Sequence, residues 1–133
     1  MSRPNPNSAR KTILLVDDEQ SVRSIVLKIL QRSNYSVLEA HDGASAIAIA
    51  EKHAGAIDLV VTDMFMPGLM GPEMVQKLVA IRPGIRALFV SGYADTDSSS
   101  GVPAGANFLG KPFSSGELNK AIEGALAGAP MAT

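Results

Sequence analysis

With 133 residues, a formal net charge of -1 at pH 7 and no cysteine, the chain has the size of one globular domain and cannot form disulfides or zinc–thiolate sites. Hydrophobic residues make up 46% and charged residues 19%, as in soluble proteins, and no apolar run reaches membrane-spanning length. Binding nucleic acid requires a basic face, which this charge balance disfavours. We therefore expect a cytoplasmic protein that binds neither DNA nor a membrane.

The two ends of the chain have little to bury. Residues 1–11 combine two prolines and three cations with almost no apolar side chain, so we expect a disordered N-terminal arm. Residues 128–133 are expected to form a flexible tail. This leaves one folded domain over residues 12–127.

Within this domain, short apolar runs alternate with segments of helical periodicity. The runs suit strands buried on both faces of a parallel sheet, and we expect five, at residues 12–16, 35–40, 58–62, 86–90 and 107–109. Helical patterns cover residues 22–32, 42–54, 71–82 and 114–126. Between residues 94 and 105 the only large apolar residue is Val102, so we expect a fourth of five helices there to be short or disordered.

Local signals mark several helix ends and faces. Proline at position 72 suits the first turn of a helix, and Ser114 with Glu117 forms a capping box. In the first helical segment, the spacing of the apolar residues predicts one buried face, with Arg23 on the opposite side. That face comprises Val22, Ile25, Val26 and Ile29. The alternation of strands and helices predicts an α/β fold, a doubly wound parallel sheet with helices on both faces.

Polar residues follow four of the five expected strands. They are Asp17 and Asp18, Asp63, Ser91 and Lys111. Because the carboxyl ends of parallel strands meet at one edge of the sheet, we expect these side chains to converge. Three adjacent carboxylates repel one another unless a cation joins them, and oxygen ligands without His or Cys favour Mg²⁺. With Lys111 and Ser91 nearby, this set suits phosphoryl transfer, with Asp63 as the nucleophile.

These residues lie in four short motifs in the order in which the strands occur. The motifs are Leu14-Leu15-Val16-Asp17-Asp18-Glu19, Asp63 with Met66-Pro67-Gly68, Ser91-Gly92-Tyr93 and Lys111-Pro112-Phe113. Together they make the chain resemble the receiver domains of two-component response regulators, over essentially all of residues 11–126. The last two motifs resemble most the receivers attached to hybrid histidine kinases.

The resemblance implies a flavodoxin-like sheet with strand order 2-1-3-4-5 and a role in a phosphorelay. Asp63 would accept a phosphoryl group from a histidine kinase or a histidine phosphotransfer protein. Asp18, Asp63 and the backbone carbonyl of Phe65 would hold Mg²⁺, with Asp17 acting through water. The chain would then be no enzyme beyond catalysing its own phosphorylation and dephosphorylation.

The resemblance also implies a conformational switch. Ser91 would move toward the phosphoryl group, Lys111 would pair with it, and the ring of Phe108 would move inward behind Ser91. The family often has Tyr at the position of Phe108, so this chain lacks the phenolic hydroxyl. The peptide bond from Lys111 to Pro112 is expected to be cis. Because the fourth helical segment is weak, we expect partners to dock near the first helix and the Pro112–Phe113 loop.

Other functions remain open from the sequence. The chain could be a pseudo-receiver, or a protein-interaction module that acts without phosphorylation, although its complete set of site residues argues against this. A phosphatase of the haloacid dehalogenase type usually carries a second Asp where this chain has Phe65. Flavin or nucleotide binding lacks a Gly-rich fingerprint. We expect a monomer or weak dimer, either a stand-alone regulator or one receiver of a hybrid kinase.

Overall fold

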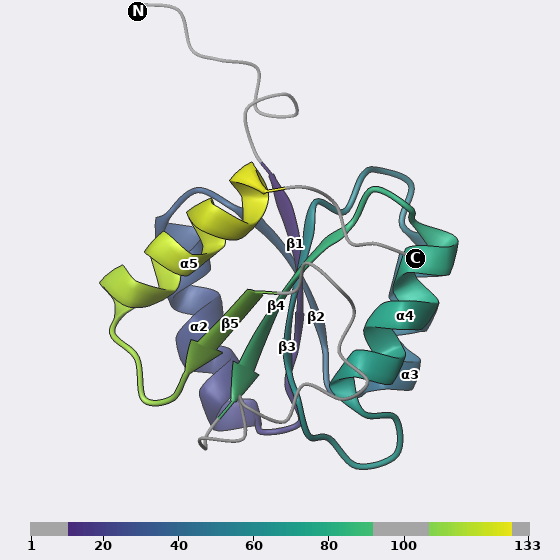
Figure 1. Ribbon diagram of the computed structural model, residues 1–133, viewed down its shortest axis with the longest axis horizontal. Helices are drawn as coiled ribbons and strands as arrows, with labels where there is room; N and C mark the ends of the chain where they lie inside the picture. Colours follow the sequence, from purple (N-terminus) through teal and green to yellow (C-terminus); the bar gives the residue numbers. More distant parts are fainter. Residues whose placement is uncertain (1–10, 92–106, 129–133) are drawn as a thin grey trace, which may run out of the picture.

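The computed structural model describes residues 11–91 and 107–128, which form a parallel sheet with helices on both faces (Figure 1). The strands are β1 (Thr12–Val16), β2 (Ser36–Ala40), β3 (Leu59–Asp63), β4 (Arg86–Ser91) and β5 (Asn107–Gly110). The helices are α2 (Gln20–Arg32), α3 (Gly43–Lys52), α4 (Gly71–Ile81) and α5 (Ser115–Ala127). The expected disordered arm before Lys11, the weak helix between 94 and 105 and the tail after 128 lie outside the described residues.

The sheet has the expected topology. Its order is β2-β1-β3-β4-β5, and every pair of neighbouring strands is parallel. Each element boundary lies within two residues of its prediction. The difference that matters is in β3, which begins at Leu59 and includes Asp63 as its last residue, because Asp63 still pairs with Val90 of β4. The carboxylate of Asp63 therefore projects from the sheet itself rather than from the following loop.

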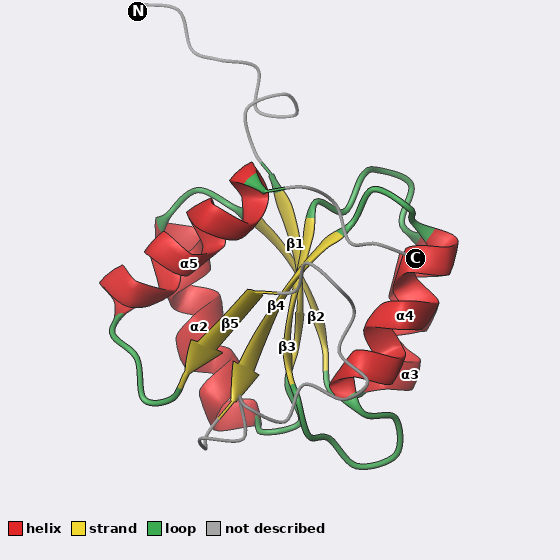
Figure 2. Cartoon of the chain, in the orientation of Figure 1, coloured by secondary structure: helices red, strands yellow, loops and turns green. Residues whose placement is uncertain are grey.

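The sheet separates two hydrophobic cores, each covered by a pair of helices (Figure 2). Helices α2 and α5 cover one face, where Leu30 and Ile122 are fully buried; α3 and α4 cover the other, where Met74 is fully buried. Alternate residues of each inner strand point to opposite cores, so Leu14 and Leu15 are both buried. Continuous apolar strands are therefore required, as the sequence pattern predicted.

The predicted capping signals are present. The Ser114 hydroxyl oxygen accepts a hydrogen bond from the Glu117 N–H at 3.1 Å, and the Glu117 carboxylate accepts one from the Ser114 N–H at 2.8 Å. At the start of α3, Asp42 accepts the Ser45 N–H at 2.7 Å, and this bond holds the pKa of Asp42 below its usual range. Among the described residues, no helix combines the length and apolar character needed to cross a membrane.

Helix α2 departs from its predicted orientation. Val26 and Leu30 form its buried stripe, whereas Ile25 is 61% exposed, although the spacing placed Ile25 on the buried face. The side chain of Arg23, expected in solvent, is only 16% exposed. The helix is thus rotated from the predicted stripe, because packing against α5 and the sheet, rather than spacing alone, selects the face that is buried.

Candidate functional site

Three carboxylates meet at the carboxyl end of the sheet. Asp17 and Asp18 follow β1 and Asp63 ends β3, and each contributes an oxygen atom within 4.8 Å of the others. Asp17 is buried, Asp63 is half-buried and Asp18 is exposed. The predicted convergence of these three residues is therefore what the fold produces, because β1 and β3 are neighbours in the sheet.

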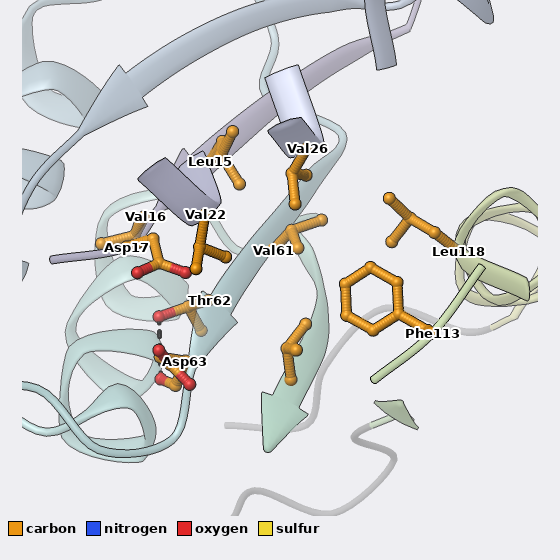
Figure 3. A pocket seen from close by; sticks show the side chains of 11 residues that line it. Leu15, Val16, Asp17, Val22, Val26, Val61, Thr62, Asp63, Phe113 and Leu118 are labelled. Carbon is orange, nitrogen blue, oxygen red and sulfur yellow. Dashed lines mark hydrogen bonds between the residues drawn. The ribbon is translucent and has the colours of Figure 1, made fainter. Parts of the chain in front are cut away.

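The turn after β1 fixes the side chain of Asp17. One of its carboxylate oxygens accepts the Glu19 N–H at 2.9 Å, and the Asp17 N–H donates to the Ala40 carbonyl at 3.2 Å. The first bond is an Asx-type turn, which Asp forms readily because its short side chain reaches the backbone two residues on. The carboxylate is thereby held in a pocket that Asp63 also lines (Figure 3).

Lys111 supplies the cation of the site. Its Nζ lies 3.3 Å from Oδ2 and 3.5 Å from Oδ1 of Asp63, and the two side chains are 23% and 13% exposed. Lys111 directly follows β5, two strands away from β3, so the sheet order and not the sequence brings the pair together. The bond to Pro112 is cis, as the resemblance implied.

Two carboxyl groups of the site, those of Asp17 and Asp63, have a raised pKa. Burial raises the pKa of Asp63, Lys111 opposes this, and the charges of Asp18 and Glu19 raise it further. Burial likewise raises the pKa of Asp17, the hydrogen bond from Glu19 opposes the rise, and the charge of Asp63 adds to it. A partly buried group of oxygen ligands whose negative charges are incompletely balanced fits a hard divalent cation such as Mg²⁺.

Figure 3 shows a pocket that the side chains of Asp17 and Asp63 help to line. Oxygen atoms of Asp17, Thr62 and Asp63 lie at one end, and apolar side chains that include Phe113 and Leu118 lie at the other. The Thr62 hydroxyl donates to the Asp63 backbone carbonyl at 3.0 Å. The carboxylates of Asp17 and Asp63 therefore share a pocket with apolar side chains, which contributes to their desolvation.

The loop from β3 to α4 approaches Asp63 closely. The Gly71 N–H donates to the Met64 carbonyl at 3.0 Å, and a Cβ atom on Gly71 would overlap the Asp63 carbonyl oxygen. Met64 is buried in the core, whereas the Phe65 side chain is 50% exposed. The sequence marked Gly71 only as a helix start, and its contact with the Asp63 backbone depends on the folded loop.

The remaining predicted residues are placed only in part. Ser91 is the last residue of β4 and pairs with Gly110 of β5, the residue that precedes Lys111. The side chain of Ser91, for which a role was predicted, lies outside what the structure describes, as does Tyr93. Phe108 of β5 is half-buried, and its ring stacks on Phe89 with centroids 5.7 Å apart. A role of the Phe65 carbonyl in binding metal stays a prediction.

The sequence-based predictions missed one contact of Asp17, in the turn after β1. Arg23 Nη1 donates to the Asp17 backbone carbonyl at 2.7 Å, and Arg23 Nε lies 3.2 Å from the Glu39 carboxylate. The available signal was its position in the first turns of α2, where a cation faces the positive end of the helix dipole. Such a placement indicates that tertiary contacts hold the side chain.

Comparison with known proteins agrees with the fold. The family model of the response regulator receiver domain matches residues 13–123. The chain therefore belongs to the response regulator receiver domain family. Domains of this family are in general signalling modules of two-component systems rather than enzymes in their own right.

The chain is similar to a sensor kinase, to a response regulator receiver protein and to a solved receiver domain. It is 40% identical over 118 residues to the sensor kinase CckA of Brucella abortus, a match that covers 87% of this chain but only 12% of that protein. It is 31% identical to the response regulator receiver protein CpdR of Brucella abortus, covering 85% of this chain and 94% of the relative. The crystal structure of the CckA receiver domain superposes with a TM-score of 0.74 at 37% identity, covering 86% and 98% of the two chains.

Proposed function

We propose that this chain is a phosphoacceptor in a two-component phosphorelay, in which Asp63 receives a phosphoryl group from a phosphohistidine. The donor would be a histidine kinase or a histidine phosphotransfer protein. The observation that carries the proposal is the convergence of three carboxylates and Lys111 at the carboxyl end of β3. Membership of the receiver family supports the same reading.

The chemistry is a displacement at phosphorus. A carboxylate oxygen of Asp63 forms a bond to phosphorus while the bond between phosphorus and the donor imidazole nitrogen breaks. The electron pair of that bond goes to the imidazole nitrogen, and the product is an acyl phosphate. Lys111, already beside Asp63, would pair with the phosphoryl oxygens and balance their charge.

The donor set fits Mg²⁺, which typically takes one or two carboxylates and completes its shell with water and phosphate oxygens. Asp18 and Asp63 would hold the ion with the Phe65 carbonyl, and Asp17 would act through water. When bound, the ion supplies charge neutralisation for the phosphoryl oxygens. The raised pKa values of Asp17 and Asp63 support this assignment, because the ionised cluster lacks a sufficient counter-charge of its own.

Phosphorylation would change the conformation through Ser91 and Phe108. Ser91 would turn toward the phosphoryl group, and the Phe108 ring would occupy the space behind it. Phe108 already packs against the core beside Phe89, the residue directly opposite it on β4, so the inward position continues an existing apolar contact. Without a hydroxyl, this ring can report the state of the site only by its packing.

The histidine donor would dock on a groove beside the site. The groove lies between α2 and the segment after β5 and is mainly apolar. It is lined by Val22, Ile25, Val26, Lys111, Pro112 and Phe113. Because Lys111 belongs both to the groove and to the acidic site, a donor helix seated there would present its histidine next to Asp63.

The test is incubation with Mg²⁺ and acetyl phosphate, read by intact mass. The wild-type chain should gain one phosphoryl adduct, stable in acid and labile in base, and Asp63→Asn should gain none. Asp58→Asn is the matched control, because Asp58 borders the same strand at its other end, and it should be phosphorylated like the wild type.

An adduct on Asp63→Asn would contradict the assignment of the acceptor. If the folded wild type gives no adduct, beryllofluoride with Mg²⁺ separates the remaining explanations. Shifts in the amide NMR spectrum around Asp63 would indicate rapid loss of the phosphoryl group. An unchanged spectrum would make the chain a pseudo-receiver that acts through protein interactions alone.

A further inference from the structure

We propose that Arg23 is a positioning residue of the acidic site. Its guanidinium group holds the backbone carbonyl of Asp17 and so fixes the turn that brings the carboxylates of Asp17 and Asp18 to Asp63. The inference rests on the proposed function in one respect, that the acidic site binds Mg²⁺. No contact between Arg23 and Mg²⁺ or the phosphoryl group is involved.

The geometry of Arg23 is that of a fork between two acceptors. Nη1 lies 2.7 Å from the Asp17 carbonyl oxygen, and Nε lies 3.2 Å from Oε1 of Glu39. The Arg23 side chain is 16% exposed, compared with 42% for Glu39, so the charge is largely withdrawn from solvent. A planar guanidinium spans two such acceptors at once, which a lysine ammonium on a flexible stem does less well.

This fork completes a clamp on the peptide groups of Asp17. The Asp17 N–H donates to the carbonyl of Ala40 at the end of β2, and the Asp17 carbonyl accepts from Arg23. Arg23 is in turn tied to Glu39, the neighbour of Ala40 on β2. The end of β2 therefore holds Asp17 on both sides, directly through its N–H and indirectly through Arg23.

Helix α2 alone gives no reason for a cation at this position. Arg23 lies close to the N-terminus of α2, where the positive end of the helix dipole favours acidic side chains. Charge alone would also make Arg23 unfavourable for a nearby metal cation. A positioning role and a purely electrostatic role therefore predict opposite signs: loss of Arg23 weakens Mg²⁺ binding in the first case and strengthens it in the second.

The experiment is a titration of the unphosphorylated chain with MgCl₂, followed by amide NMR shifts. Arg23→Met retains much of the apolar stem and removes the donors, and its dissociation constant for Mg²⁺ should rise about tenfold, as for other groups that orient metal ligands. Arg23→Lys should fall between Arg23→Met and the wild type. Arg32→Met, on the exposed last turn of the same helix, removes the same charge and should bind like the wild type.

The outcomes separate the two levels of the proposal. If the wild type binds Mg²⁺ and Arg23→Met binds it equally or more tightly, the positioning role is wrong and the metal site stands. If the wild type does not bind Mg²⁺, the metal part of the proposed function fails and the inference with it. Urea unfolding of each variant shows whether it is folded; should Arg23→Met not fold, Arg23→Lys and Glu39→Gln, which disturb one arm of the fork, must still weaken binding.

Discussion

An aspartate directly precedes β3 and another is its last residue, and the two lie in opposite surroundings. At the amino end, Asp58 is satisfied by backbone groups: its carboxylate accepts the Thr12 N–H at 2.8 Å, and its carbonyl accepts the Arg86 N–H at 3.2 Å. At the carboxyl end, Asp63 lies among other carboxylates and has Lys111 as its cationic partner. Asp58 links neighbouring strands, whereas burial raises the pKa of Asp63.

The contrast shows how a parallel sheet separates stability from function. At the amino end of β3, hydrogen bonds from the neighbouring strands β1 and β4 reach the carboxylate and the carbonyl of Asp58. At the carboxyl end, β1 and β3 bring like charges together in a pocket that apolar side chains also line, so the burial that favours the core disfavours these groups. Functional sites commonly carry such unfavourable arrangements.

The largest expected effect is a difference in stability between substitutions of two glycines, one close to Asp63 and one in the turn before β4. Gly71→Ala should lower the free energy of unfolding by about 3 kcal/mol, because its Cβ would overlap the Asp63 carbonyl and force the loop to move. Gly84→Ala, in the turn before β4, meets no atom within 4 Å and should be nearly neutral. Urea denaturation measures the free energy of unfolding of both variants. Equal losses in the two variants would show that the close approach of Gly71 to the Asp63 carbonyl does not limit stability.

A second pair of substitutions compares two exposed isoleucines. Ile25→Asn, in the groove near the site, should slow phosphoryl transfer from a histidine kinase about tenfold, equivalent to roughly 1.4 kcal/mol, while the rate with acetyl phosphate stays unchanged. Ile81→Asn, at the end of α4, is the control and should leave both rates unaltered. If both donors slow equally in Ile25→Asn, the substitution disturbs the site and not docking.

A third pair of substitutions, at the two aspartates, should change the free energy of unfolding in opposite directions. Without metal at neutral pH, Asp63→Asn should raise the free energy of unfolding by about 1 kcal/mol, because it removes a desolvated charge that other carboxylates repel. Asp58→Asn should lower it by about 1 kcal/mol, since it weakens a charge-assisted hydrogen bond to Thr12. Stabilisation at both positions would argue that general surface charge, not the site, is responsible.

The difference in stability between Asp63→Asn and the wild type should also depend on pH. Because the pKa of Asp63 is raised in the folded chain, the proton binds more tightly to the folded than to the unfolded state. Its contribution to stability is present in acid and is lost as the pH rises through the folded pKa. The advantage of Asp63→Asn over the wild type should therefore vanish in acid and grow with pH. Saturating Mg²⁺ should stabilise the wild type at neutral pH and reduce that advantage.

The smallest expected effect concerns the exposed side chain of Phe65. The Phe65 side chain is 50% exposed and lies two residues after Asp63, and we expect it to restrict a water that would attack the phosphoryl group. Phe65→Asn should speed dephosphorylation about threefold, or roughly 0.7 kcal/mol in barrier height. Decay of the adduct by intact mass measures this, with Phe65→Leu as the apolar control. No change in Phe65→Asn would show that the ring does not limit access.

Much of the fold could be predicted because its signals are local. Apolar runs specified the strands, Ser114 and Glu117 specified the start of α5, and the alternation of elements specified a parallel sheet. The predicted convergence of Asp17, Asp18 and Asp63 followed from a rule of topology rather than from any contact in the sequence. Spacing failed for Ile25, because several rotations of a helix satisfy the same pattern.

The sequence by itself determined which residue types stand at the strand ends, and thereby the family and the chemistry available to the site. The tertiary structure alone decided that Asp17 is buried while Asp18 is exposed, and that Arg23 turns back to the Asp17 carbonyl. It also decided how closely Gly71 approaches Asp63. These features arise from side-chain and loop packing between elements distant along the chain, and local periodicity carries no information about such contacts.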